Sequence, residues 1–161
     1  MQRICLFPGT FDPFTLGHKD IIDRALPLFD RLVVGIGRNM NKQPMFSEQQ
    51  RLQWIKDIYQ GNDRVSAVIY DGLTVSACEA VGANFILRGI RYVNDFEYEK
   101  AIADMNRSLR ENVETVFLTC LPQFTSVAST LVRDVIKNGG DASQFLPEVV
   151  NETIRNKLFT T

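Results

Sequence analysis

Short apolar runs alternate along this chain with longer segments in which apolar residues recur every three or four positions. The first run, Ile4 to Phe7, is continuously apolar, as expected of a strand buried on both faces of a parallel sheet. Such runs predict strands at residues 4–7, 31–37, 64–70, 84–87 and 115–121. Helical spacing predicts helices at residues 19–29, 48–59, 73–81, 94–109, 129–137 and 147–159. Repeated strand–helix alternation implies an α/β fold, a Rossmann-like five-stranded parallel sheet with helices on both faces.

Residues with strong positional preferences mark several of the predicted helix ends. The segment from Ser47 to Gln50 is typical of a capping box at the start of the second helix, and Asn94 or Asp95 is expected to cap the fourth. Pro27 interrupts the last turn of the first helix, so that end should be kinked or frayed. Turns are short and no linker or internal repeat is present, so residues 1–161 are expected to form a single domain.

The charge of the chain is nearly balanced, with 18 Lys and Arg residues against 19 Asp and Glu residues. A formal net charge of −1 produces no overall field that would favour nucleic acid or a membrane surface. No apolar run approaches membrane-spanning length, and the N-terminus lacks the apolar segment of a signal peptide. A bound polyphosphate would therefore need basic residues that the fold gathers locally.

The three cysteines, Cys5, Cys78 and Cys120, are widely spaced and form no CxxC pair. Cys5 and Cys120 lie inside apolar runs, which favours buried free thiols and a reducing, cytoplasmic location. A single histidine cannot build a His-rich metal centre, so no metal site made by the protein itself is expected.

Four loops that follow predicted strands carry groups suited to phosphate. The carboxyl ends of parallel strands meet at one edge of a sheet, where helix N-termini also present N–H groups to anions. Donors that are distant in sequence should therefore converge there. The candidates are Thr10 and His18 in the first loop, Lys42 in the second, Arg88 and Arg91 around the fourth strand, and residues 125–130, followed by Arg133, after the fifth.

Each of these residues also has a purely structural interpretation. His18 could simply begin a helix or be a core imidazole, and Thr10 could bond its own backbone in a turn. Lys42 could be a solvated charge, and Arg88 and Arg91 could be surface arginines rather than a phosphate clamp.

One hydroxyl-rich segment and one acidic segment also have purely structural interpretations. Residues 125–130 could serve only to cap the helix that follows. Asp95, Glu97 and Glu99 could simply complement the dipole of the fourth helix, although Asp95 and Glu99 are like charges four residues apart.

The first loop carries a family resemblance. The tetrapeptide Thr15-Leu16-Gly17-His18, preceded by the segment from Pro8 to Pro13 with the sequence PGTFDP, resembles the T/HxGH signature of the nucleotidyltransferase superfamily. The tetrapeptide alone would be weak evidence, but the apolar strand before it and the lead-in make the match specific. The resemblance implies a single nucleotidyltransferase domain. No GxGxxG follows the first strand, which disfavours a dehydrogenase.

A second set of segments narrows the resemblance to the bacterial phosphopantetheine adenylyltransferase family. The stretch from Arg88 to Glu99, with the sequence RGIRYVNDFEYE, is followed by Met105-Asn106 and resembles that family. So do the segments 42–46 (KQPMF) and 129–133 (STLVR). The similarity runs from Phe7 to about Pro147, which is nearly the whole chain.

The resemblance implies a reaction and a set of partners. Members of the family transfer AMP from ATP to 4′-phosphopantetheine, which gives dephospho-coenzyme A and pyrophosphate in the penultimate step of coenzyme A biosynthesis. They use Mg²⁺, here expected to bind through the phosphates of ATP rather than through protein ligands. They are typically cytoplasmic homohexamers and are inhibited by coenzyme A.

The resemblance also implies roles for individual residues. The residues expected to contact the reacting phosphates are His18, Thr10, Lys42 and Arg91. Those expected on the pantetheine side are Thr10, Lys42, Thr74 and Arg88. The ATP-side positions would be Thr10, Phe11, His18, Gly89, Ile90, Arg91, Glu99, Phe124, Thr125, Ser126, Val127, Ala128, Ser129 and Thr130. The family often has an aromatic residue followed by an ISSS-like or ISST-like run where this chain has the stretch from Phe124 to Thr130, so the missing hydroxyl at Ala128 implies a contact through the backbone there.

Two other functions remain open from the sequence. Another small-molecule nucleotidyltransferase, such as a nicotinamide mononucleotide adenylyltransferase or a glycerol-phosphate cytidylyltransferase, would share the T/HxGH signature. A nucleotide-binding regulatory module could also keep the fold without turnover. The presence of His18, Lys42 and Arg91 argues against loss of catalysis.

Overall fold

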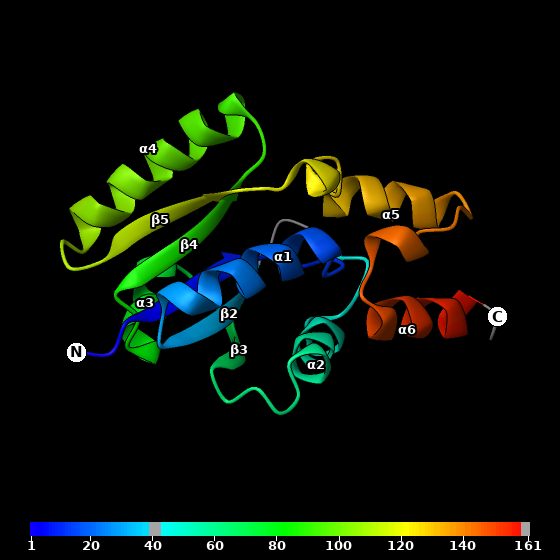
Figure 1. The fold of residues 1–161 in the computed structure, drawn as a ribbon, viewed down its shortest axis with the longest axis horizontal. Coiled ribbons are helices and arrows are strands. Elements are labelled where there is room, and N and C mark those ends of the chain that lie inside the picture. The colour runs from blue at the N-terminus through cyan, green and yellow to red at the C-terminus, as the bar shows by residue number, and fades with distance from the viewer. Residues whose placement is uncertain (39–42, 159–161) are drawn as a thin grey trace.

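The computed structural model describes residues 1–38 and 43–158 of the chain. Its strands are β1 (Ile4–Gly9), β2 (Arg31–Gly37), β3 (Val65–Tyr70), β4 (Phe85–Ile90) and β5 (Glu114–Thr119). Its α-helices are α1 (Leu16–Ala25), α2 (Glu48–Ile58), α3 (Thr74–Val81), α4 (Val93–Leu109), α5 (Ser129–Lys137) and α6 (Glu148–Leu158). Every strand pairing is parallel, which confirms the predicted α/β fold with a five-stranded parallel sheet (Figure 1).

The strand order of the sheet is β3-β2-β1-β4-β5. The chain therefore proceeds outward from β1 to β3 and then crosses back to β4, so β1 and β4 are neighbours where the direction of winding reverses. Six residue pairs join β1 to β2, whereas β1 and β4 pair only at Cys5 with Phe85 and at Leu6 with Ile86. The two strands thus separate toward their carboxyl ends, and ligands of open α/β sheets bind at such a reversal.

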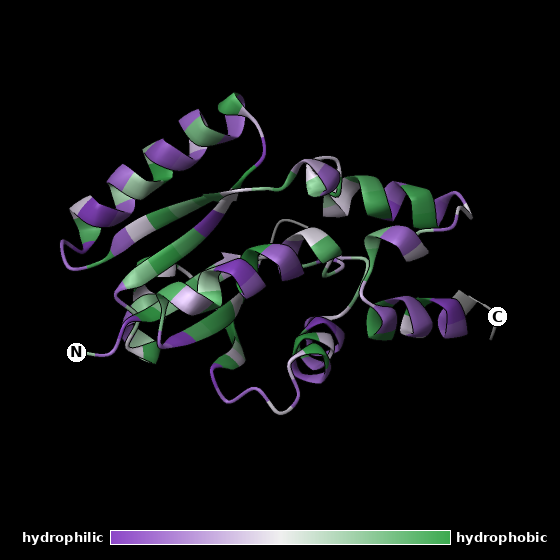
Figure 2. Cartoon of the chain, viewed as in Figure 1, coloured by the Kyte–Doolittle hydropathy of each residue, from purple (hydrophilic) through white to green (hydrophobic). Residues whose placement is uncertain are grey.

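Helices cover both faces of the sheet, and each face has its own core. On one face, residues of α1 and α2 such as Ile22 and Ile55 pack with Phe7 and Val34. On the other, Cys78 of α3 packs against strand residues that point away from the first core. Figure 1 shows α1 and α3 on opposite sides of the strands, and Figure 2 shows that the strands are largely hydrophobic. The alternation of side chains along each strand explains the two layers.

A third core lies beside the sheet and joins the last two helices to α2. Trp54 of α2 packs with Phe46, with Val132 of α5 and with Val150 and Ile154 of α6. The ring centroids of Phe46 and Trp54 are 4.9 Å apart in an edge-to-face arrangement. This core holds α5, and therefore the loop before it, against the rest of the molecule.

Several predicted boundaries were wrong in informative ways. Helix α1 begins at Leu16 rather than at residue 19, because Thr15 caps it. Helix α4 begins at Val93 after Tyr92, and neither Asn94 nor Asp95 is its N-cap. Strand β4 continues to Ile90, so Arg88 lies within the strand and does not follow it.

Other local predictions agree with the structure. Ser47 caps α2 by accepting a hydrogen bond from the backbone N–H of Gln50, which is one of the two hydrogen bonds of the predicted capping box. Helix α1 gives way at its end to a 3₁₀ turn, Leu26–Leu28, which contains Pro27. Cys5 and Cys78 are buried and Cys120 is half-buried, all with free thiols. Within residues 1–38 and 43–158, no helix is long and apolar enough to cross a membrane.

Candidate active site

A cavity of about 590 Å³ opens at the carboxyl edge of the sheet, between the ends of β1 and β4. Most of the predicted site residues line it: Thr10, Phe11, His18, Arg88, Gly89, Arg91, Glu99, Phe124, Val127, Ala128, Ser129 and Thr130. Its wall does not include Ile90, Thr125 or Ser126. Lys42 lies outside the described residues. Side chains from separate loops thus meet where the winding of the sheet reverses.

His18 is the third residue of α1 and takes part in a reciprocal cap. The backbone N–H of His18 donates to Thr15 Oγ1, while the backbone N–H of Thr15 donates to His18 Nδ1 at 3.0 Å. Because Nδ1 accepts this hydrogen bond, it carries no proton, and the proton of the neutral ring is on Nε2. The cap therefore sets both the tautomer and the orientation of an imidazole that lines the cavity.

The surroundings of His18 keep its ring neutral. Burial lowers the pKa of the imidazole to about 4, and the nearby guanidinium groups of Arg91 and Arg88 act in the same direction. The rings of Phe11 and Phe14 lie against it, with centroids 4.9 Å and 5.4 Å from that of His18. At neutral pH, His18 thus presents a neutral ring with an N–H donor to the cavity, and not an imidazolium.

Phe11 is positioned by an unusual backbone conformation. Its φ is 52°, in the left-handed region that residues other than glycine rarely occupy. The ring is buried and stacks over Gly9, where an added Cβ would lie only 2.9 Å from Phe11 Cζ. Gly9 therefore has to lack a side chain so that the Phe11 ring can take its place in an edge-to-face contact with His18.

Arg88 is held rigidly from two sides. Its guanidinium makes a bidentate ion pair with Glu99, with Nε–Oε2 at 2.7 Å and Nη2–Oε1 at 2.5 Å. Its Nη1 donates to the carbonyl oxygen of Pro8 at 2.7 Å, across the gap where β1 and β4 separate. Glu99, which the resemblance places on the ATP side, is the partner of Arg88 in the structure. The pair fixes a cation between two parts of the site.

Arg91 lies beyond the end of β4 and is less constrained. Asp95 accepts hydrogen bonds from the backbone N–H of Arg91 at 3.1 Å and from its Nε at 3.3 Å. The side chain remains about one third exposed. It supplies positive charge to the cavity wall near His18 while keeping room to reorient.

The loop before α5 presents backbone rather than side-chain donors. Ala128 is the N-cap of α5, and this residue has no side-chain oxygen with which to cap the helix. The hydroxyl of Ser129 donates to the carbonyl oxygen of Pro13 at 2.8 Å, and that of Thr125 donates to the carbonyl oxygen of Leu121. These hydroxyls hold the loop, and the first N–H groups of α5 are donors of the kind that suit an anion.

A second cavity of about 350 Å³ adjoins the first and shares Thr10, Arg88 and Glu99 with it. Thr74, predicted on the pantetheine side, lines this second cavity. Its hydroxyl lies 3.2 Å from that of Tyr70. The candidate residues thus divide into two adjoining spaces with Arg88 at their junction.

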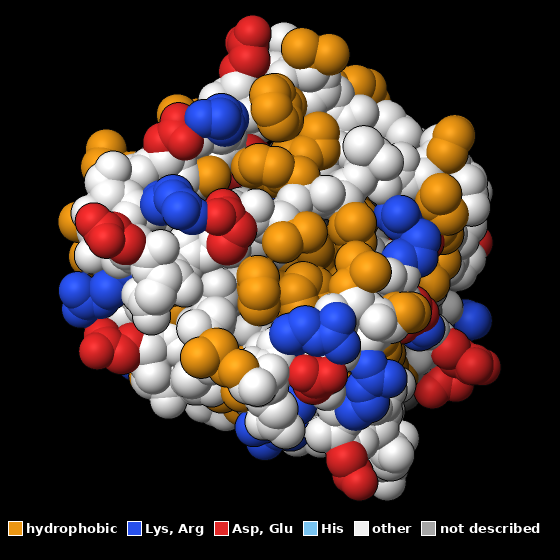
Figure 3. Space-filling view, turned by 60° about the vertical axis from the view of Figure 1, so that its left-hand side comes forward, with side chains coloured by type: hydrophobic (Ala, Val, Ile, Leu, Met, Phe, Trp, Pro, Cys, Tyr) orange, Lys and Arg blue, Asp and Glu red, His pale blue; other side chains and the backbone are white. Residues whose placement is uncertain are grey.

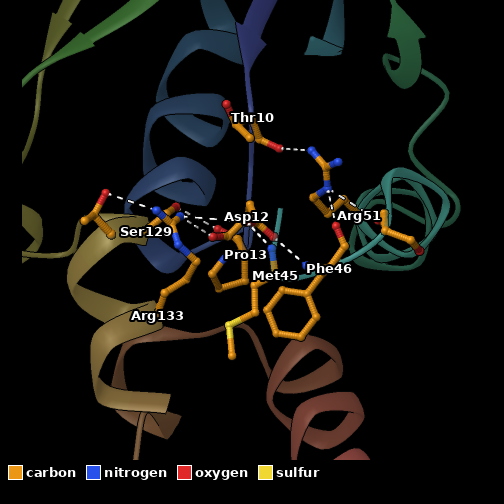
Figure 4. Close-up of polar contacts among 10 residues, drawn as sticks. Thr10, Asp12, Pro13, Met45, Phe46, Arg51, Ser129 and Arg133 are labelled. Carbon is orange, nitrogen blue, oxygen red and sulfur yellow. Dashed lines mark hydrogen bonds and ion pairs between the residues drawn. The ribbon is translucent and has the colours of Figure 1, made fainter. Parts of the chain in front are cut away.

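Two buried charged residues of the site were missed by the sequence analysis as functional candidates. Asp12 and Arg51 line the main cavity and are 3% and 4% exposed. Figure 4 shows them on either side of the segment that contains Met45 and Phe46. Asp12 lies inside the PGTFDP motif, which was one available signal, whereas nothing in the helical pattern distinguished Arg51 from a surface arginine.

Comparison with known proteins identifies the family to which the chain belongs. The family model described as cytidylyltransferase-like matches residues 6–135, which places the chain in the nucleotidyltransferase class. A solved bifunctional NMN adenylyltransferase/ADP ribose pyrophosphatase from Francisella tularensis has the same fold, with a TM-score of 0.69 at 20% identity, covering 91% of this chain and 45% of that chain. A solved structure from Vibrio parahaemolyticus gives a TM-score of 0.72 at 21% identity, covering 97% of this chain and 93% of that chain.

Curated relatives identify the family within the nucleotidyltransferase class. The phosphopantetheine adenylyltransferase of Flavobacterium psychrophilum is 49% identical over 92% of this chain and 98% of its own length. The phosphopantetheine adenylyltransferase of Bacteroides thetaiotaomicron is 47% identical over 91% of this chain and 97% of its own length. That of Limosilactobacillus reuteri is 41% identical over 98% of this chain and 91% of its own length. The chain belongs to the phosphopantetheine adenylyltransferase family.

Proposed function

We propose that the chain transfers AMP from ATP to 4′-phosphopantetheine and releases dephospho-coenzyme A and pyrophosphate. The observation that carries this proposal is the neutral His18 ring, whose Nδ1 is occupied by Thr15 and whose Nε2–H is free to donate in a cavity also lined by Arg88 and Arg91. The identity to phosphopantetheine adenylyltransferases over most of the chain supports the choice of acceptor.

The reaction requires the protein to position the two substrates and to stabilise the charge that develops on the α-phosphate. The phosphate of the acceptor attacks the α-phosphorus of ATP in line, a P–O bond forms, and pyrophosphate leaves with the electrons of the broken bond. The attacking phosphate is already anionic near neutral pH, so no general base is required. His18 Nε2–H donates to a non-bridging α-phosphate oxygen as its charge builds. Arg91 and, by resemblance, Lys42 offset the repulsion between the two anionic reactants.

The two adjoining cavities suit two substrates. ATP occupies the larger space, with its phosphates toward the N-terminus of α5 and toward His18. The pantetheine arm occupies the smaller space beside Thr74, with its phosphate near Thr10 and Arg88 at the junction. Arg88 is the residue best placed to hold the acceptor phosphate, because Glu99 already fixes its guanidinium.

Mg²⁺ is proposed to enter with ATP. In residues 1–38 and 43–158, no group of three or more His, Cys, Asp or Glu side chains is arranged to hold a metal ion. Phosphate oxygens and water would therefore supply the ligands, and the bound ion would neutralise charge on the polyphosphate. The side chains of this protein would bind the nucleotide and not the metal itself.

We further propose that the protein is a cytoplasmic homohexamer inhibited by coenzyme A. Support for self-association comes from the exposed apolar side chains along α4, which include Val93, Tyr98 and Met105. Figure 3, in which the α4 side comes forward, shows hydrophobic side chains gathered on this face. The three free thiols suit a reducing compartment. Light scattering should give six times the chain mass of 18.3 kDa.

The test of the proposed function is release of pyrophosphate from ATP and Mg²⁺, with and without 4′-phosphopantetheine. Release that requires 4′-phosphopantetheine is expected. Nicotinamide mononucleotide and, with CTP as the nucleotide donor, glycerol 3-phosphate serve as matched alternative acceptors. Turnover with one of these instead would place the chain among other nucleotidyltransferases, and ATP binding without any release would make it a regulatory module.

A further inference from the structure

Asp12 is a buried carboxylate that joins two segments distant in sequence. Its Oδ2 accepts a hydrogen bond from the backbone N–H of Met45, and its Oδ1 accepts one from that of Phe46, both at 2.8 Å. With 3% exposure, these contacts lie out of solvent, where a charge-assisted hydrogen bond is strong and its loss is costly. The loop after β1 is therefore fastened to the segment just before α2.

Arg51 makes the reverse connection from α2. Its Nη1 donates to the carbonyl oxygen of Thr10 at 2.6 Å, and its Nε donates to that of Phe46 at 3.0 Å. Together with Asp12 it closes a ring of contacts through Phe46, Arg51 and Thr10 (Figure 4). Burial lowers the pKa of Arg51, while the carboxylates of Asp12 and Glu48 oppose that effect. Asp12 and Arg51 are the two buried charged side chains of the ring, and Arg133 Nη1 lies 3.9 Å from Asp12 Oδ2.

The start of α5 is attached to the same loop. Arg133 Nη1 donates to the carbonyl oxygen of Asp12 at 2.6 Å, and Ser129 Oγ donates to that of Pro13 at 2.8 Å. Three segments that carry predicted substrate contacts thus meet at residues 10–13. None of these contacts uses the side chain of Thr10 or His18, so the network can fix the backbone without occupying their donor groups.

We propose that Asp12 and Arg51 are positioning residues for nucleotidyl transfer, which hold Thr10 and the loop leading to His18 in register with the segment before α2. This proposal rests on the proposed function. A displacement of about 1 Å in a catalytic group costs on the order of 100-fold in rate, so a backbone anchored from both sides has a direct effect on turnover.

The variants Asp12→Asn and Arg51→Lys test the proposal with little change in volume. In Asp12→Asn, the new amide would turn its NH₂ group toward one of the two backbone N–H donors. In Arg51→Lys, the ammonium group lacks the planar fork that reaches both Thr10 and Phe46. We expect kcat to fall by about 10-fold to 100-fold in each variant. ATP affinity measured by calorimetry should change less than about threefold, because the N–H groups of α5 are unaltered and Arg133 keeps its hydrogen bond to the carbonyl oxygen of Asp12.

Matched controls come from contacts of the same type at the opposite edge of the sheet. Asp30 accepts from the backbone N–H of Arg3 at 2.7 Å, and Arg64 donates to the carbonyl oxygens of Leu26 and Phe29. None of these residues lines either cavity. Asp30→Asn and Arg64→Lys should leave kcat within about twofold of the unmodified protein, since they lie away from the site.

The only tryptophan of the chain reports on the anchored segment directly. Trp54 packs against Phe46, so its fluorescence should shift in Asp12→Asn and not in Asp30→Asn. Normal kcat in both folded site variants would overturn the positioning role, and so would loss of the native fold in both, which would make these residues purely structural. Absence of turnover in the unmodified protein would instead overturn the proposed function.

Discussion

Helices α1 and α5 begin at the same edge of the sheet but meet the cavity differently. Thr15 and His18 form a reciprocal cap at the start of α1, which orients a side chain of this helix, the imidazole of His18, at the cavity wall. Ala128 leaves the first turn of α5 without a side-chain cap, so that helix offers its backbone N–H groups. A transition-state donor needs one exact orientation, whereas a polyphosphate needs several donors of moderate strength. The two helix starts suit the two roles proposed for them.

The largest expected effect comes from removing the side chain that α1 presents. His18→Ala should lower kcat by on the order of 100-fold to 1000-fold, the usual loss for one preorganised transition-state donor. KM for ATP should change little, because the N–H groups of α5, which are proposed to bind the phosphates, are unaltered. Steady-state pyrophosphate release measures both quantities. A near-normal kcat would show that the capped imidazole of α1 has no catalytic role.

The neutral state of His18 predicts how stability depends on pH. Its pKa is about 4 in the folded protein, below the ordinary value of 6.5, so the unfolded chain binds a proton that the folded chain does not. This stabilisation is complete above about pH 6.5 and is lost as the pH falls toward about 4. Between about pH 7.5 and about pH 5, the protein should lose on the order of 2 kcal/mol more stability than His18→Ala.

Urea unfolding of both proteins at the two pH values measures this difference. The comparison with His18→Ala cancels the contributions of carboxylates that titrate in the same range. Equal losses in the two proteins would mean that His18 titrates alike in the folded and unfolded states. The claim that α1 presents a neutral imidazole to the cavity would then be wrong.

Removing the cap of α1 should have a smaller effect. Thr15→Ala deletes the oxygen that accepts from the backbone N–H of His18, which should cost about 1 kcal/mol of unfolding free energy. The backbone N–H of Thr15 would still donate to Nδ1, so kcat should fall by no more than about fivefold. Thr15→Ser keeps the hydroxyl and serves as the control. A loss of kcat as large as that of His18→Ala would show that the hydroxyl, not the backbone N–H, orients the ring.

Adding a cap to α5 should have the smallest effect. Ala128→Ser would supply the missing acceptor and should raise the stability of the ligand-free protein by about 0.5 to 1 kcal/mol. The hydroxyl would then compete mildly with phosphate for the same N–H groups. Thermal melts with and without ATP measure both effects. No gain in the ligand-free protein would mean that the first turn of α5 is already satisfied.

The parallel sheet could be predicted from the sequence because each strand is a short apolar run and each helix keeps its spacing. The strand order could not, since periodicity says nothing of which strands are neighbours. Arg88 was expected to end its strand, yet β4 continues to Ile90 because pairing with β5 extends that far. A polar residue near the carboxyl end of a strand, such as Arg88, interrupts the apolar pattern without ending the strand.

The candidate site shows the same limit. The motif around His18 predicted the residue but not its tautomer, which depends on the backbone N–H of Thr15. Arg51 and Asp12 act through backbone atoms 41 and 34 residues away, contacts that leave no periodic signal in the chain. Glu99 was predicted beside ATP, and its pairing with Arg88 follows only from the way α4 lies on β4.

The most direct measurement is the NMR titration of the single histidine in tag-free protein labelled with ¹⁵N-histidine. One ring gives all the signal, and its two nitrogen shifts report tautomer and protonation together. We predict the Nε2–H tautomer at neutral pH and a titration midpoint near 4. A proton on Nδ1, or a midpoint near the ordinary value of 6.5, would contradict the assignment of His18 as the neutral donor of this active site.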